Sequence, residues 1–218
     1  MQKAPALAPA IVRNSLILGL FAVFTVGIIA FTQQATEQRI TVERQRMQMR
    51  ALNEILPDDQ HDNDLLQDSW LIDDRRYLHL PAPAQAWRGR QDNVVTAVIL
   101  PVTTVDGYSG RIDLLVGIYA DGQLAGVRVV NHRETPGLGD KIELGKSRWI
   151  LAFNGKSLSM LAPKGWGVRR DGGDFDQFTG ATITPRAVVQ AVYNALQYFS
   201  ENRSSLLQLS AEESSDDR

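Results

Sequence analysis

The chain has 218 residues, of which 44% are hydrophobic and 22% charged, a length and composition that fit one membrane segment and one globular domain. The net charge of −2 and the scattered Lys and Arg residues argue against nucleic acid as a partner. The absence of cysteine excludes disulfides, thiolate catalysis and cysteine-ligated iron–sulfur clusters, and the histidines form no HxxxH or HxH pair that would bind a metal. Any redox chemistry therefore requires another cofactor.

An uncharged apolar run from Ser15 to Phe31 would be roughly 25 Å long as a helix, at about 1.5 Å per residue. Ile11 and Val12 extend it to the thickness of a bilayer. We therefore predict a transmembrane helix over residues 11–31, preceded by a cytoplasmic segment over residues 1–10. A cleaved signal peptide is the alternative, but its apolar run would be shorter, and small residues in an A-x-A-like pattern should follow it, which they do not.

The charges that flank this segment point away from an exported domain. Lys3 and Arg13 precede the segment, whereas four arginines follow it within the range that the positive-inside rule counts: Arg39, Arg44, Arg46 and Arg50. Long translocated domains follow this rule poorly. The count therefore carries little weight in deciding the orientation.

We expect residues 32–56 to form a juxtamembrane helix that continues from the membrane. Four apolar residues recur on one helical face: Ile40, Met47, Ala51 and Ile55. Pro57 should end this helix, and the acidic, polar stretch 57–68 is typical of a loop. We place the globular domain over residues 57–202.

Two strand-like runs, residues 111–120 and 123–130, flank the dipeptide Asp121-Gly122. Both runs are rich in β-branched or aromatic residues, and Asp-Gly is a strong signal for a hairpin turn. The run VVTAVILPV over residues 94–102 is predicted to be another strand of the same sheet. The pattern therefore predicts an antiparallel sheet.

A helix is expected from Thr184, with Thr184 as its N-cap and Pro185 at its first helical position. Four apolar residues then recur near one face: Val188, Val192, Ala195 and Phe199. The polar residues 203–218 are predicted to be a disordered tail. Strands and helices together predict an α+β domain.

The segment DQFTGAT, from Asp176 to Thr182, directly precedes this helix. The small residues Gly180 and Ala181 leave the Thr182 hydroxyl accessible, and the helix directs its unpaired N–H groups towards Thr182. A phosphate ester on Thr182 would be stabilised there. Taken alone, the segment also fits an ordinary turn, with Gly180 at positive φ and threonines in capping roles.

A second segment, ETPGLG from Glu134 to Gly139, follows the hairpin. Pro136 and two glycines favour a tight turn that a flat ring could approach closely. Taken alone, this segment also fits a plain turn that leaves the sheet. The histidines offer nothing further, because His61, His79 and His132 stand in unrelated contexts.

DQFTGAT resembles the motif D-x-x-S/T-G-A-T, in which a flavin transferase attaches FMN through its phosphate to the final threonine, here Thr182. With ETPGLG about forty residues upstream, it is similar to the FMN-binding domains of the G subunit of Rnf complexes and the C subunit of sodium-pumping NADH:quinone reductases. The resemblance extends to the N-terminal apolar helix and to the segment GYSGRIDLLVGI at residues 107–118. The modest length favours the Rnf protein over the quinone-reductase protein.

This resemblance implies covalent FMN on Thr182 and a set of further cofactor-binding residues, with no catalytic or metal-binding residue. The further residues are Asp176, Thr179, Gly180, Ala181, Glu134, Thr135, Gly137, Leu138 and Gly139. Residues that line or support the site would include Gly107, Tyr108, Gly110 and Ile112, although such a strand entry also fits simple packing.

The resemblance also implies an electron-carrier subunit rather than a stand-alone catalyst. Its complex would pass electrons between ferredoxin and NAD and couple them to Na⁺ or H⁺ transport. Partners would be the other membrane subunits, a flavin transferase during maturation, and membrane lipid. The chain would sit in the bacterial inner membrane with its FMN domain in the periplasm. The remaining alternative is a membrane-tethered module that binds a partner without redox chemistry.

Overall fold

The structure, a computed structural model, describes residues 7–208. The predicted cytoplasmic segment and tail therefore lie partly outside the described residues. The chain divides into two compact units between Met47 and Gln48, and one long helix, α1 (Leu7–Ile55), begins in the first unit and ends in the second.

The first unit contains the apolar part of α1. Its segment Ile11–Thr36, with a mean hydropathy of 2.3, is long and apolar enough to cross a membrane, and it exceeds the predicted span at its C-terminal end. The hydroxyls of Thr25, Thr32 and Thr36 each donate to the carbonyl four residues earlier at 2.8 Å. These polar groups are therefore satisfied within the helix, as an apolar surrounding requires.

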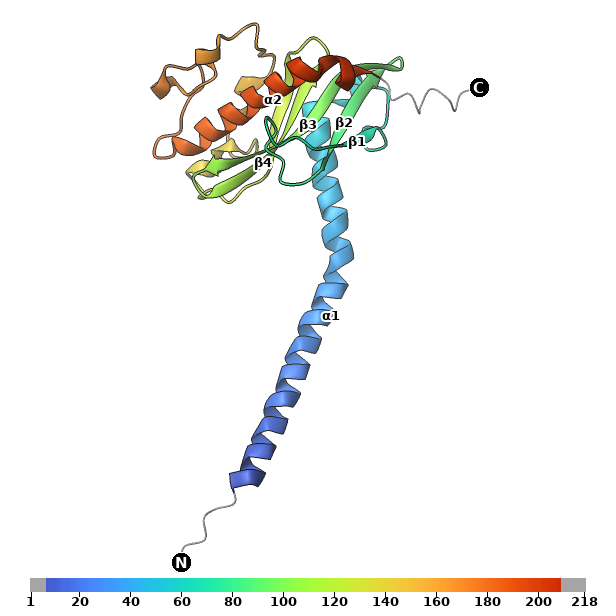
Figure 1. Cartoon of the computed structure of the whole chain (residues 1–218), viewed down its shortest axis with the longest axis vertical. Coiled ribbons are helices and arrows are strands. Elements are labelled where there is room, and N and C mark those ends of the chain that lie inside the picture. The colour runs from blue at the N-terminus through green and yellow to red at the C-terminus, as the bar shows by residue number, and fades with distance from the viewer. Residues whose placement is uncertain (1–6, 209–218) are drawn as a thin grey trace, which may run out of the picture. The chain divides into compact units, whose positions relative to one another are not determined.

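The second unit is built on one antiparallel sheet whose five strands neighbour one another in chain order (Figure 1). The strands are β1 (Ser69–Ile72), β2 (Ala84–Gln91), β3 (Val94–Gly107), β4 (Gly110–Tyr119) and β5 (Leu124–Asn131). The helix α2 (Ile183–Leu207) completes the unit together with short 3₁₀ helices, η1 (Asp58–Gln60), η2 (Gly139–Ile142), η3 (Arg148–Phe153), η4 (Pro163–Gly165) and η5 (Arg169–Asp171). The predicted α+β class and the hairpin at Asp121-Gly122 are confirmed.

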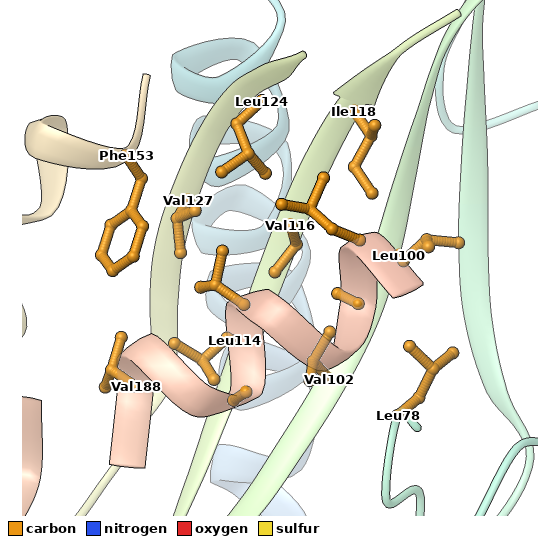
Figure 2. Close-up of a cluster of buried hydrophobic side chains, with 14 of the residues drawn as sticks. Leu78, Leu100, Val102, Leu114, Val116, Ile118, Leu124, Val127, Phe153 and Val188 are labelled. Carbon is orange, nitrogen blue, oxygen red and sulfur yellow. The ribbon is translucent and has the colours of Figure 1, made fainter. Parts of the chain in front are cut away.

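One face of the sheet packs against α2. Alternate residues of the central strands point to this face, as the period of two in a strand requires, among them Val102 of β3 and Leu114 and Val116 of β4. Figure 2 shows these side chains in one cluster with Val188 of α2, and the cluster is buried. The main hydrophobic core therefore lies between the sheet and α2.

The opposite face of the sheet receives the last turns of α1. Leu52, Ile55 and Leu56 are buried there in a second cluster, against Trp87, Ala97, Ile99 and Leu115 from the strands. Because these residues belong to the domain core, the predicted domain start at residue 57 is too late. Ala51 and Ile55 pack as the predicted apolar face requires, whereas the side chains of Ile40 and Met47 lie outside the described residues.

Two glycines let α1 approach the sheet this closely. A Cβ atom at Gly117 would lie 2.2 Å from Ile55 Cγ2, and one at Gly89 would lie 2.2 Å from Leu56 Cδ2. A side chain at either position would collide with the helix, so glycine is required by packing rather than by backbone conformation.

The C-terminal end of α1 is also closed by a buried arginine. Arg128 of β5 donates from Nη2 to the carbonyl of Glu54 at 2.8 Å and from Nε to the Glu54 carboxylate at 2.8 Å. The last carbonyls of a helix lack partners within the helix, and a cation is favoured at that end. Arg128 thus fixes the end of α1, which stops just before Pro57 as predicted.

At the other end of the domain, α2 continues to Leu207, so the expectation of a disordered tail from residue 203 is wrong for residues 203–207. Leu206 is buried in the main core, and its carbonyl accepts a hydrogen bond from Arg88 Nε at 3.3 Å. Tertiary packing therefore stabilises a polar helix end. Residues 209–218 lie outside the described part of the chain.

Candidate functional site

Three segments converge on a pocket of about 380 Å³ at one end of α2. They are the turn between β3 and β4, the turn that follows β5, and the start of α2. The pocket is lined by Tyr108, Glu134, Thr135, Leu138, Gly139, Gly180, Ala181, Thr182, Ile183 and Thr184. Its volume lies within the range of about 300–1,000 Å³ that is usual for small-molecule sites.

The helix α2 starts two residues earlier than the cap prediction implies. It begins at Ile183 with Thr182 as the N-cap residue, so Thr184 is not the cap and Pro185 stands third in the helix rather than first. The reason is tertiary: Thr184 is completely buried, and its hydroxyl donates to Glu134 Oε2 at 2.5 Å. Proline is still tolerated in the first turn, where its missing N–H would lack a partner.

The N-terminus of α2 leaves donors free beside the pocket. The Thr182 side chain makes no capping hydrogen bond, and the N–H groups of Ile183 and Thr184 have no acceptor within the described part of the chain. Unpaired N–H groups and the positive end of the helix dipole favour an anion at this position. Thr182, a half-buried residue, lines the pocket at this helix start.

Aromatic packing fixes the segment that carries Thr182. Phe178 is buried against Trp149, with ring centroids 5.1 Å apart, and Trp149 Nε1 donates to the carbonyl of Asp176 at 2.8 Å. Gly180 has φ +81°, the left-handed conformation that the sequence predicted, and the Ala181 N–H donates to the Phe178 carbonyl at 3.1 Å. This tight turn presents Thr182 to the pocket.

The turn after β5 supplies the opposite wall. Gly137 has φ +79°, and its N–H donates to Asp140 Oδ1 at 2.8 Å. The carbonyl of Thr135 accepts from the N–H groups of Leu138 and Gly139, both at 3.1 Å. The turn is therefore held by its own hydrogen bonds, as its glycines and proline predicted.

Glu134 joins all three segments. Its Oε1 accepts from the backbone N–H of Ser109 at 2.9 Å, in the β3–β4 turn, while its Oε2 accepts from Thr184 in α2. Gly107 and Gly139 pack directly on it, because a Cβ atom at these positions would lie 2.8 Å from Oε1 and 2.7 Å from Oε2. Glu134 is only 5% exposed.

Large apolar side chains surround the pocket without being covered. Tyr108 is 70% exposed, Ile183 45% and Leu138 43%. All three line the pocket, so a flat apolar ligand could cover them. The site thus combines an apolar rim, a buried carboxylate and free N–H donors.

An ion pair ties the first turn of α2 to η5. Arg186 donates to Asp171 from Nε at 2.6 Å and from Nη2 at 2.9 Å. These hydrogen bonds hold the pKa of the Asp171 carboxyl below its ordinary value and raise the pKa of Arg186. The pair is solvent-exposed, and it lies outside the pocket lining.

The structure brings together seven of the predicted site residues: Thr182, Gly180, Ala181, Glu134, Thr135, Leu138 and Gly139. Gly137 shapes the turn without lining the pocket. Asp176 and Thr179 are exposed and do not line it, and the Asp176 carboxylate instead pairs with Arg169 at 3.1 Å.

Of the supporting candidates, Tyr108 lines the pocket, Gly107 packs on Glu134, and Ile112 belongs to the core. Sequence reasoning missed Ser109 and Ile183, and it misassigned Thr184. An apolar residue directly after Thr182, at the exposed start of a helix, was an available signal for Ile183.

Comparison with known families gives two matches. A family described as FMN-binding domain matches residues 107–197, which include all three segments of the pocket. A family described as RnfG N-terminal region matches residues 1–55.

Curated relatives are similar over nearly the whole chain. The chain is 53% identical to the G subunit of the ion-translocating oxidoreductase complex of Pseudomonas aeruginosa (strain UCBPP-PA14), over 89% of this chain and 91% of that protein. It is 46% identical to the protein of that name from Shewanella loihica, over 90% and 93% of the two chains. A relative of the same name from Vibrio cholerae (strain ATCC 39541) is 44% identical, over 90% and 94%.

Proposed function

This chain belongs to the G-subunit family of ion-translocating oxidoreductase complexes, and on that premise we propose that it carries electrons through FMN held in the pocket at the start of α2. When bound, FMN supplies reversible electron transfer, while the protein supplies binding, orientation and electrostatics. The observation that carries the proposal is the unpaired N–H of Ile183 beside the Thr182 hydroxyl, which makes no capping hydrogen bond, inside the residues matched by the FMN-binding domain.

The residues of the pocket fit this cofactor. The N–H group of Ile183, an exposed residue, suits a phosphate, because the unpaired donors of a helix N-terminus stabilise an anion. The exposed side chains of Tyr108, Leu138 and Ile183 suit a flat ring, which would remove their apolar surface from water. Phosphate and ring would thus occupy different parts of one pocket.

The finer proposal is that the FMN phosphate is esterified to Thr182. The Thr182 hydroxyl makes no capping bond and so remains available, and the ester would stay a single anion at the helix N-terminus. Thr184 is a poor alternative because it is completely buried and its hydroxyl is engaged with Glu134. Thr182 is therefore the residue whose position suits attachment best.

Asp176 and Thr179 have a different place in this proposal. Both are exposed and outside the pocket, so they suit recognition by the flavin transferase during maturation rather than contact with bound FMN. The transferase would reach them from solvent on the same turn that presents Thr182.

Mass spectrometry tests the attachment directly. The chain expressed with a flavin transferase should gain the mass of one FMN less one water, and the modified peptide should place that mass on Thr182. Thr182→Ala is the matched variant for the peptide assignment, since it removes the proposed attachment hydroxyl and should leave the peptide unmodified. Modification at Thr179 or Thr184 with Thr182 unchanged would refute the assignment, and an unmodified chain would refute covalent attachment.

We further propose that the domain lies in the periplasm, with α1 crossing the inner membrane through Ile11–Thr36 among lipids. The other subunits of the complex would supply and accept the electrons, between ferredoxin and NAD, coupled to Na⁺ or H⁺ transport. Only a short N-terminal segment would stay inside, and for a long translocated domain the flanking arginines are a weak determinant. The lack of cysteine suits this compartment.

Protease accessibility tests the orientation. Protease added to intact spheroplasts that express the subunit without its complex should digest the domain. Full protection in spheroplasts, followed by digestion after lysis, would place the domain in the cytoplasm.

A further inference from the structure

Glu134 has an unusual environment for a carboxylate. It is buried, and both of its oxygens accept hydrogen bonds, one from the Ser109 N–H and one from the Thr184 hydroxyl. Both donors are neutral groups. Burying an ionised group is costly unless it is paired with an opposite charge, so the cost at Glu134 depends on which cations face it.

No cation compensates Glu134 in the part of the chain that the structure describes. Among the side chains that the structure describes, no ion pair joins its carboxylate to a Lys, Arg or His residue. The nearest imidazole, that of His132, accepts the Glu134 N–H at Nδ1 at 3.0 Å, and its Nε2 faces the Glu143 carboxylate at 2.8 Å. Because His132 Nδ1 accepts the backbone N–H, the imidazole directs no N–H group at the Glu134 carboxylate.

Two glycines pack closely against this carboxylate. Gly107 and Gly139 both lack the Cβ atom that would collide with its oxygens. Glutamine in the same place could satisfy the same two partners, because its amide oxygen can accept from Ser109 and its NH₂ can donate to the Thr184 hydroxyl. The two hydrogen bonds alone therefore do not explain why this position holds glutamate rather than glutamine.

We propose that Glu134 is an uncompensated negative charge that lowers the reduction potential of FMN bound in this pocket. The inference rests on the proposed function. Reduction adds an electron to FMN, and a fixed carboxylate in the pocket wall disfavours that added negative charge, more strongly where water is excluded. In this step no bond forms or breaks at Glu134 and no proton leaves it. The consequence is a cofactor that gives up its electron more readily.

The test compares Glu134→Gln with Glu143→Gln, both carrying covalent FMN, by spectroelectrochemical titration. Glu134→Gln should raise the equilibrium constant for one-electron reduction at least tenfold, which is about 59 mV. Glu143→Gln removes a charge from a residue close along the chain, but its side chain is 41% exposed, so solvent should screen the change to less than threefold. An unchanged or lowered potential in Glu134→Gln would overturn the proposal.

Two further measurements separate charge from structure. Glu134→Asp keeps the charge, so its FMN reduction potential should lie nearer to that of wild type than to that of Glu134→Gln. If the role of Glu134 were purely structural, the shorter Asp side chain should shift the potential further from wild type than Gln does. If Glu134→Gln does not fold, the carboxyl ¹³C shift of Glu134 in the oxidised wild-type protein decides: an ionised shift at neutral pH supports the charge, and a protonated shift overturns it. Absence of the FMN mass from wild type would instead overturn the proposed function.

Discussion

The two helix ends that meet the sheet of this domain differ in whether the protein supplies hydrogen-bond partners for their backbone groups. The C-terminus of α1 is closed by protein, since Arg128 donates to a Glu54 carbonyl and the last turns are buried. The N-terminus of α2 is left open, with an unpaired N–H group at Ile183, a residue that lines the pocket. A helix end whose backbone groups are hydrogen-bonded within the protein stabilises the fold. A helix end that leaves N–H groups unpaired beside a cavity can bind a ligand there.

Glycines allow close packing at both helix ends, but a Cβ atom at these glycines would contact different groups at each end. At the closed end, Gly89 and Gly117 make room for the apolar side chains of α1. At the open end, Gly107 and Gly139 make room for the carboxylate of Glu134. Replacing a glycine at the first place should cost stability without reaching the pocket. At Gly107 a Cβ atom would lie 2.4 Å from the Gly110 carbonyl oxygen as well as close to Glu134, so a change there should affect both stability and the cofactor.

The largest expected loss of stability comes from Gly117→Val. The new Cβ would lie 2.2 Å from Ile55 Cγ2, so the end of α1 must shift, and overpacking of this kind costs about 1–3 kcal/mol of unfolding free energy or more. Denaturant unfolding of the full chain in detergent measures it. Gly145→Val is the control, because a Cβ atom at Gly145 meets nothing within 4 Å. Equal stability of the two variants would show that α1 is not seated on β4.

Arg128→Met should have the next largest effect. It leaves the Glu54 carbonyl without its donor at a part-buried helix end, a loss of about 1–3 kcal/mol at most. FMN attachment should be unchanged, because Arg128 does not line the pocket. Arg111→Met, which removes a half-exposed arginine paired with Asp113, should cost less than about 1 kcal/mol. A loss of attachment in Arg128→Met would contradict the separation of the two helix ends.

Thr182→Ala should abolish covalent FMN and yet change the unfolding free energy of the flavin-free chain by no more than about 0.5 kcal/mol. The reason is that the Thr182 side chain makes no capping hydrogen bond. Flavin fluorescence after denaturation reports the attachment, and thermal unfolding reports the stability. A destabilisation comparable to the loss of a helix cap, about 1 kcal/mol, would mean that the hydroxyl already closes this helix end.

Leu138→Glu should have the smallest effect on stability, because the side chain is exposed at the pocket rim. FMN should still attach at Thr182, but the charge should alter the absorbance spectrum or potential of the ring. Leu158→Glu, at a half-buried position outside this pocket, is the comparison for spectra. Identical spectra and potentials in fully flavin-bearing wild type and Leu138→Glu would place the turn after β5 away from the ring.

Local turn chemistry explains what the sequence predicted well. Asp121-Gly122 and Gly180 depend on neighbouring residues alone, so the hairpin and the left-handed glycine follow from the sequence. The sequence did not predict the strands β1 and β2. Strand β2 contains Arg88, Gly89 and Arg90, which resemble a polar loop. Arg88 is nevertheless buried, since its guanidinium lies 4.2 Å from the Trp70 ring centroid.

Long-range contacts explain the remaining errors. Thr184 resembles a helix cap, and only the contact with Glu134, fifty residues earlier, assigns its hydroxyl elsewhere. The seating of Leu52 and Ile55 depends on glycines in strands far along the chain. Asp176 and Thr179 belong to the motif, but the path of the turn places them outside the pocket. Motifs thus identified the pocket segments but not the role of each residue.

Amide hydrogen exchange at the two helix ends tests most directly whether the open end of α2 binds the FMN phosphate. The flavin-free chain, expressed without a flavin transferase, is compared with the chain that carries FMN. Exchange at Ile183 should slow at least tenfold on attachment, because its N–H group gains an acceptor, while exchange at Leu52 and Ile55 should stay the same. Unchanged exchange at Ile183 in fully FMN-bearing protein would contradict this role of the helix end.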